Sequence, residues 1–167
     1  MKLKHNEIII NEKITLNETQ NTRTVTMLNL KNGKTDKLIY YKKDNKMYSS
    51  ITNKYIYLDL ANLDYESNNI YAIITYSKKS SNKTYYFSYY TLSNAVGKSA
   101  TEAGIVSFVI GSMGAVFPPA DIAAGILGAY SAGASAALLN TSKSKNHGLY
   151  ITVNSNPFRH IVGFGRY

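Results

Sequence analysis

Cysteine is absent from this 167-residue chain, and histidine is scarce, with three residues. Without cysteine the protein cannot contain a disulfide framework, a thiolate metal site or a cysteine nucleophile. The histidines are His5, His147 and His160, and none stands at metal-ligand spacing from another histidine or an acid. A glycine-rich phosphate loop with a lysine is also missing. We therefore expect no catalytic residues, no metal site and no cofactor, and the protein is not predicted to be an enzyme.

Acidic residues are also few. The chain has 10 Asp and Glu against 19 Lys and Arg, which gives a formal net charge of +9 at pH 7. Residues 1–100 hold 15 of the basic residues and 8 of the acidic ones. A basic surface attracts anionic partners, and each Lys or Arg close to an anionic membrane gains about 1 kcal/mol. An anionic bacterial membrane or cell envelope is the expected partner. Nucleic acid is the least favoured partner, because the sequence has no recognition motif for it.

The amino-terminal residues lack the apolar core of a secretory signal peptide. Met1–His5 is basic, but the apolar run that follows is only Ile8–Ile10, flanked by Glu7 and Glu12. An apolar core of about 7–15 residues is needed. The sequence leaves four options open: export without a leader, release by lysis, a processed form, or a cytoplasmic location.

Residues 1–92 have the pattern of a basic, tyrosine-rich β region. Apolar and polar residues nearly alternate from Arg23 to Leu30, and Asn32-Gly33 is a strong hairpin signal. Similar alternation predicts further strands in an antiparallel meander of six or seven, at 37–42, 47–52, 54–60, 70–77 and 84–91. The chain has 15 tyrosines. They suit a sheet with an amphipathic outer face, and they leave open a membrane interface or a stacking platform for sugars or bases.

A stretch of forty residues, 103–142, contains a single formal charge, Asp121. It consists of two apolar runs separated by Pro118 and Pro119. Adjacent prolines end a helix, and the same residues suit the first turn of the next one, where Asp121 favours the positive end of the helix dipole. The stretch is therefore predicted to be a helical hairpin whose tip is Pro118, Pro119 and Asp121.

Each predicted helix has small residues on one face and large apolar residues on the other. Six glycines in the two runs cost about 1 kcal/mol each relative to alanine, and close helix packing would compensate for them. The small-xxx-small spacing, a glycine-zipper pattern, is typical of helix contacts in lipid. The residues expected to form the helix–helix contact are Ser107, Gly111, Gly114, Gly125, Gly128 and Ala132. The residues expected to enter a membrane are Ile105, Val109, Ile110, Val116, Phe117, Ile122, Ile126, Leu127, Tyr130 and Leu138.

The sequence allows two interpretations of the hairpin. It can be the permanently buried hairpin of a globular domain, or a segment that inserts into membranes. Each run is short for a span, which needs about 20 residues, and Asp121 would cost about 3 kcal/mol at the bilayer centre. Both interpretations can hold for one protein in two states.

The expected fold is α+β. Residues 93–142 form the hydrophobic hairpin with its lead-in, for which Ser93 is the expected cap. Residues 143–167 are predicted to form a carboxy-terminal β-hairpin with a turn at Ser155-Asn156-Pro157. This hairpin is expected to complete the same domain, and it could join the amino-terminal sheet.

The Gly/Ala-rich hairpin and the short basic tail after it resemble the membrane-active part of large unmodified Gram-positive bacteriocins of the closticin type. The basic residues of the tail are Lys143, Lys145, Arg159 and Arg166. The resemblance covers the chain from about residue 100 onward, rests on composition and layout, and implies killing of bacteria by permeabilisation. We therefore expect a secreted antimicrobial protein or toxin that binds anionic envelopes and inserts the hairpin, with self-oligomers on the membrane left open. The alternative is a non-enzymatic, membrane-associated binding or immunity protein whose hairpin stays buried or anchored.

Overall fold

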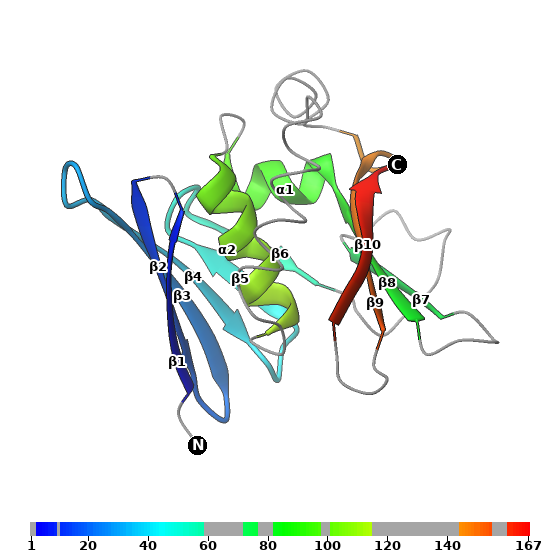
Figure 1. Ribbon diagram of the computed structural model, residues 1–167, viewed down its shortest axis with the longest axis horizontal. Coiled ribbons are helices and arrows are strands. Elements are labelled where there is room, and N and C mark those ends of the chain that lie inside the picture. Colours follow the sequence, from blue (N-terminus) through cyan, green and yellow to red (C-terminus); the bar gives the residue numbers. More distant parts are fainter. Residues whose placement is uncertain are drawn as a thin grey trace.

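The structure, a computed structural model, describes residues 3–9, 11–58, 72–76, 82–97, 101–114, 144–154 and 160–167. This part of the chain has the α+β fold that the sequence predicts, with two antiparallel sheets and two helices (Figure 1). In chain order the elements are β1 (Leu3–Ile9), β2 (Glu12–Glu18), β3 (Thr22–Asn29), β4 (Thr35–Tyr41), β5 (Lys46–Ser49), β6 (Lys54–Tyr57), β7 (Ala72–Tyr76), β8 (Asn82–Ser88), α1 (Tyr89–Val96), α2 (Glu102–Met113), β9 (Gly148–Asn154) and β10 (His160–Arg166).

The first sheet is a six-stranded antiparallel meander in the order β1-β2-β3-β4-β5-β6. Its strands alternate between buried and partly exposed residues, as expected for a sheet with one face in the core. The predicted turn between β3 and β4 is confirmed. Gly33 has a φ of 73°, and its N–H bonds the Asn29 carbonyl oxygen at 2.8 Å.

The second sheet has four antiparallel strands in the order β10-β9-β8-β7. Two expectations are therefore corrected: the meander does not continue through β7 and β8, and the carboxy-terminal hairpin does not join the amino-terminal sheet. The physical reason is the long-range pairing of β8 with β9, in which the Thr84 and Thr152 hydroxyls bond at 2.8 Å. Gly148 begins β9 so close to β8 that a Cβ there would collide with the Phe87 carbonyl oxygen.

Helix α1 replaces the end of a predicted strand. The expected strand over 84–91 stops at Ser88, whose hydroxyl accepts a hydrogen bond from the Thr91 N–H at 3.2 Å and caps α1. The cap expected at Ser93 was wrong, because the Ser93 hydroxyl instead donates to the Tyr90 carbonyl oxygen within the helix. The helix ends at Gly97, which has a φ of 82°.

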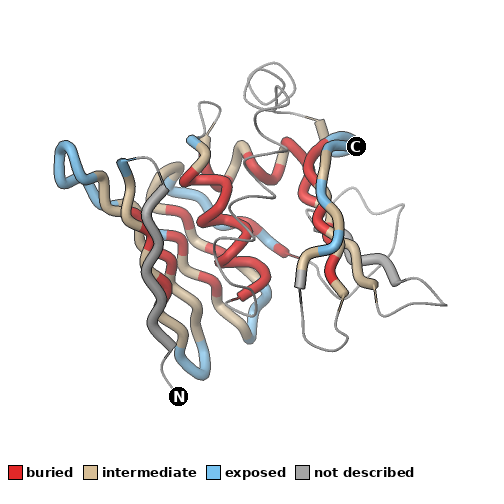
Figure 2. Tube along the Cα trace, in the orientation of Figure 1, coloured by how far each residue is buried: buried red, intermediate tan, exposed pale blue. Residues whose placement is uncertain are grey.

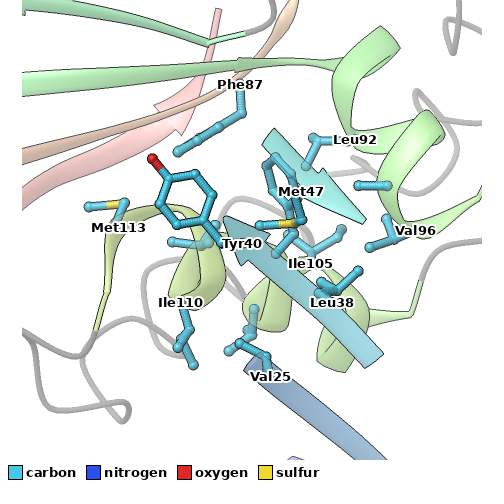
Figure 3. Packing of buried hydrophobic residues seen from close by; sticks show 14 of the residues in the cluster. Val25, Leu38, Tyr40, Met47, Phe87, Leu92, Val96, Ile105, Ile110 and Met113 are labelled. Atoms are coloured by element: carbon cyan, nitrogen blue, oxygen red, sulfur yellow. The ribbon is translucent and has the colours of Figure 1, made fainter. Parts of the chain in front are cut away.

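A single cluster of buried apolar residues contains members of both sheets and both helices. Helix α2 lies between the sheets, and its ribbon is buried along almost its whole length (Figures 1 and 2). Side chains from the strands and from both helices meet in this core (Figure 3). The fold therefore places the first of the two predicted apolar runs at the centre of the molecule.

Candidate functional site

Helix α2 begins and ends at residues suited to those positions. The Thr101 hydroxyl accepts a hydrogen bond from the Gly104 N–H at 3.1 Å, and Glu102 places a negative charge in the first turn. The helix ends where Gly114 takes a φ of 87°, and the Gly114 N–H bonds the Ile110 carbonyl oxygen at 2.8 Å. The 12-residue helix is therefore about 18 Å long.

Helix α2 is buried on every face. All residues from Ala103 to Met113 are buried. The helix packs on β2, β3 and β4 and on α1, and the Phe108 ring meets the Phe87 ring of β8 edge to face, with centroids 5.5 Å apart. A helix that is apolar all round suits a protein core or a membrane.

Three of the residues predicted to enter a membrane lie in α2. These are Ile105, Val109 and Ile110, and each is at most 3% exposed. In this structure they fill the protein core. The other predicted membrane-facing residues lie outside the described residues, namely Val116, Phe117, Ile122, Ile126, Leu127, Tyr130 and Leu138. The predicted tip, Pro118, Pro119 and Asp121, also lies outside them. In the described part of the chain, no helix has the length and hydropathy that a membrane crossing requires.

The small residues of α2 face its protein surroundings. A Cβ at Gly111 would lie 2.9 Å from Cε of Met47 and 3.5 Å from Cγ2 of Val25. Glycine therefore lets α2 approach β3 and β5 closely. The Ser107 hydroxyl is buried and has no hydrogen-bond partner within the described ranges. The remaining predicted packing residues, Gly125, Gly128 and Ala132, lie outside those ranges, so packing of α2 against a second helix stays a prediction.

Arg23 of β3 holds the carboxy-terminal end of α2. Its Nη1 donates hydrogen bonds to the carbonyl oxygens of Gly111, at 2.9 Å, and Ser112, at 3.1 Å. The guanidinium carbon lies 4.9 Å from the centre of the Tyr40 ring. A cation at this end of a helix also interacts favourably with the helix dipole. A strand of the first sheet thus binds the last turn of the buried helix.

Glu18 fixes Arg23 from the other side. Its Oε1 accepts hydrogen bonds from Nε of Arg23, at 3.1 Å, and from Nζ of Lys42, at 2.8 Å. The side chains of Arg23 and Glu18 are only 15% and 17% exposed. Burial alone would raise the pKa of Glu18, but the hydrogen bonds and charges of Lys42 and Arg23 outweigh it and hold that pKa below its usual range. We call Arg23, Glu18 and Lys42 the clamp.

The clamp binds carbonyl groups that a longer helix would use. In an α-helix the carbonyl of one residue accepts the N–H of the fourth residue after it. Extension of α2 would pair Gly111 and Ser112 with the N–H groups of Ala115 and Val116. Because Arg23 already satisfies these two carbonyls, it stabilises the short form of α2 relative to a longer one.

Sequence reasoning did not identify the clamp. The sequence signal for it was the two-residue spacing within the strands. Arg23 shares a face with Val25 and Met27, and Glu18 shares a face with Leu16, although the other three residues are buried and apolar. Charged residues in phase with buried ones must find partners inside or at the rim of the core. The helix end that supplies those partners for Arg23 is 88 and 89 positions away in the sequence.

A cavity of about 360 Å³ lies between β6 and α1. It is lined by Lys54, Tyr55, Ile56, Tyr90 and Asn94, and Lys54 Nζ donates to Asn94 Oδ1 at 3.2 Å. This lining offers a cation and two phenol rings to a ligand. Among the residues that the structure describes, no group of His, Asp and Glu could hold a metal ion.

Comparisons with known proteins supply no relative: no protein-family model, no curated protein and no solved structure matches the chain. The resemblance to bacteriocins therefore stays a prediction. The function has to be inferred from the buried helix, the clamp and the surface of the protein itself.

Proposed function

We propose that the protein is a secreted, membrane-active antimicrobial protein or toxin that acts like a bacteriocin, without catalysis. Its basic surface adsorbs to an anionic bacterial envelope, and the apolar segment 103–142, beginning with α2, then leaves the core and permeabilises the bilayer. The observation that carries the proposal is that α2 is apolar on all faces, while a single arginine binds its carboxy-terminal carbonyls.

The energetics of transfer support such a movement. Exposing one large apolar side chain to water costs about 1.5–3 kcal/mol. Lipid tails are as apolar as leucine side chains, so the side chains of α2 itself lose little when the helix moves from the core into a bilayer. The inner faces of the two sheets lose their cover in this movement, so the proposal requires them to pack against each other or against lipid. The polar interactions of α2 add to this balance. Hydrogen bonds from a charged donor contribute about 1.5–3 kcal/mol each, and Arg23 makes two of them to α2.

Insertion also requires α2 to lengthen. Its length of about 18 Å is well short of the hydrocarbon thickness of about 30 Å, and growth as far as Phe117, the last residue before the two prolines, would bring it to about 24 Å. Gly114 permits extension, since glycine adopts both the left-handed conformation seen here and the α conformation. Dissociation of Arg23 would free the carbonyls of Gly111 and Ser112 to accept bonds from the next turn. Release from the sheet and growth of the helix are thereby coupled.

A second candidate function is a non-enzymatic, membrane-associated binding or immunity protein in which the segment stays buried or anchored. The complete burial of α2 favours this candidate, because a core helix requires no second state. The two candidates differ in whether the pure protein permeabilises a membrane.

Dye release from liposomes distinguishes them. Purified protein at micromolar concentration is added to dye-loaded vesicles of phosphatidylglycerol or of phosphatidylcholine. The proposal predicts release from the anionic vesicles and little release from the zwitterionic ones. Intact anionic vesicles from acidic to neutral pH, with the protein soluble and monomeric, would reject permeabilisation. Recovery of the protein only in detergent would favour a permanent anchor.

A further inference from the structure

The strands of the first sheet from β2 to β6 have lysines and no acidic residue at their outer positions, opposite to α2; one acid reaches this face from a turn, Asp44, whose side chain is exposed and whose Oδ2 lies 3.9 Å from Nζ of Lys46. Buried residues such as Val25, Leu38 and Met47 point toward α2, so their neighbours in each strand lie on the outer face. The acidic residues of these strands lie on the same face as the buried residues, toward α2. They are Glu12, Glu18 and Asp36. The outer positions instead contain three lysines: Lys13, Lys37 and Lys46.

One end of this face is a compact block of tyrosines around a lysine. Strand register places Tyr41, Lys46 and Tyr57 side by side, and it pairs Tyr48 with Tyr55 in the neighbouring row. We call these five residues the Tyr-Lys platform. Lys46 Nζ lies 5.0 Å from the centre of the Tyr55 ring and 5.8 Å from that of Tyr41. Tyr55 and Tyr57 are 54% and 56% exposed, so the platform is accessible from solvent.

We infer that the Tyr-Lys platform binds a phosphate-bearing glycan. The Lys46 ammonium group suits a phosphate oxygen. Phenol hydroxyls can donate hydrogen bonds to sugar hydroxyls and accept hydrogen bonds from them. Strand β3, which pairs with β4, adds three more hydroxyl groups to the outer face: Thr22, Thr24 and Thr26. Tyr55 also lines the cavity between β6 and α1, where Lys54 supplies a second cation.

A glycan fits this face better than a bilayer does. Surfaces that lie in the membrane interface bury large apolar residues below the headgroups. The outer positions of β2 to β6 have only two aliphatic side chains, Leu28 and Ile39, among hydroxyl and lysine groups. The choice also rests on the proposed function, because a bilayer bound here would be separated from α2 by the sheet. A glycan bound here leaves the opposite side of the molecule free to face the membrane.

A glycan also fits better than single-stranded nucleic acid. Bases bind such proteins by stacking on open aromatic faces. Here Lys46 lies over the Tyr41 and Tyr55 rings, and the Tyr48 ring packs against Tyr55 at 5.2 Å with a tilt of 51°. The platform therefore offers ring edges and hydroxyl groups more than flat stacking surfaces.

Calorimetric titration of the full chain with phosphomannan tests the inference. Unphosphorylated mannan, inorganic polyphosphate, a single-stranded oligonucleotide and phosphatidylglycerol vesicles are titrated in parallel. We expect phosphomannan to bind tightest, with affinity reduced about fivefold by Lys46→Ala and about tenfold by Tyr55→Ser combined with Tyr57→Ser. The control Lys31→Ala removes the same charge at an exposed turn and should change affinity less than about twofold. Thermal unfolding confirms that the variants fold.

Three outcomes would overturn the inference: no phosphomannan binding, equal losses in the platform and control variants, or tighter binding of another probe. Its failure is distinguishable from failure of the proposed function. The vesicles carry no glycan, so the double tyrosine variant should release dye from them as the wild-type protein does. Intact glycan binding without any dye release would reject permeabilisation alone.

Discussion

Arg23 makes the polar contacts that distinguish the end of α2 from the rest of its apolar surface. Replacing Arg23 with methionine keeps an unbranched stem of similar length up to the Nε position and removes two hydrogen bonds to α2 and one to Glu18. We expect Arg23→Met to lower the free energy of unfolding by about 2–3 kcal/mol and to lower the protein concentration needed for dye release. Urea unfolding and vesicle leakage measure the two effects.

The matched control for that variant is Lys31→Met, which removes a charge at the exposed turn between β3 and β4. It should change stability by less than about 0.5 kcal/mol and leave dye release unchanged. Equal leakage thresholds for Arg23→Met and the wild-type protein would show that Arg23 does not restrain α2.

Glu18 makes the stability of the folded state depend on pH. Lys42 and Arg23 lower its pKa below the usual 4.5 in spite of its burial. Its contribution is therefore fully present above the pKa of the unfolded chain and is lost as pH falls through the lower folded value. We expect the free energy of unfolding to fall below pH 4.5 and to fall less in Glu18→Gln. Urea unfolding at a series of pH values measures this.

Glu12 has the opposite effect on how stability depends on pH, so its contribution must be measured separately from that of Glu18. Burial, followed by repulsion from Asp36, raises the pKa of Glu12, so acid relieves an unfavourable charge there. The variant Glu12→Gln should therefore steepen the loss of stability in acid. A pH profile of Glu18→Gln as steep as that of the wild-type protein would contradict the role assigned to Glu18.

The substitution Gly114→Ala tests whether the glycine cap at the end of α2 limits extension of the helix. Gly114 has a φ of 87°, and a Cβ there would lie 3.2 Å from the guanidinium carbon of Arg23. Alanine strains this cap by about 1–3 kcal/mol, because φ 87° with ψ 175° is a conformation that essentially only glycine adopts, and alanine favours a continuing helix over glycine by about 1 kcal/mol. We expect lower thermal stability and faster dye release.

Gly97→Ala is the control, because Gly97 ends α1 with a φ of 82° and its Cβ would meet nothing within 4 Å. It should lose similar stability without faster dye release. Equal acceleration by both variants would indicate that leakage follows general destabilisation instead of extension of α2.

Local sequence patterns predicted which helices and strands form better than they predicted which strands pair with each other. The Asn32-Gly33 turn and the alternating strands of the first sheet follow from turn chemistry and period. A helix was also predicted over the first apolar run, but its end was expected at the prolines, with Gly114 inside the helix as a packing residue. This was wrong: α2 ends at Met113, and Gly114 is its cap, with a φ of 87°. The aromatic run at Tyr85–Tyr90 hid the boundary between β8 and α1, because tyrosine suits a strand and the signal for the helix was the single cap Ser88. The division into two sheets depends on the pairing of β8 with β9, which no local pattern encodes.

The same limit applies to the candidate site. The apolar character of α2 was visible in the sequence, but the residues that hold it were not. The net charge of residues 1–100 gives no role to Arg23 or Glu18, although their spacing from Val25 and Leu16 puts both on the inner face of the sheet. The contacts of Arg23 come from the tertiary fold, which brings β3 to the end of α2.

On the scale of the whole molecule, α2 separates two sheets that face it from different sides. Phe108 joins it to the second sheet through Phe87, and Gly111 lets it approach the first sheet. Exit of α2 would therefore open the core and expose the inner faces of both sheets. In the proposed function, the clamp and the apolar packing keep the core closed until a membrane offers α2 an equally apolar environment.

A reversible disulfide tests most directly whether α2 leaves this position. The chain has no cysteine of its own, so an engineered pair has a single intramolecular pairing. A Cβ on Gly111 would lie 3.5 Å from Cγ2 of Val25, the position that the sulfur takes in Val25→Cys, so Gly111→Cys with Val25→Cys would lock α2 to β3 once the flexible end of Met47, 2.9 Å from that Cβ, moves aside. The control pair is Gly163→Cys with Thr152→Cys, whose Cβ atoms would lie 3.6 Å apart; it links β10 to β9 and leaves α2 free.

Dye release from anionic vesicles is then measured for both pairs, oxidised and reduced. We predict that the oxidised lock abolishes release, that dithiothreitol restores it, and that the control pair releases dye in both redox states. Equal release by the oxidised lock and the oxidised control would show that the protein acts on membranes without moving α2.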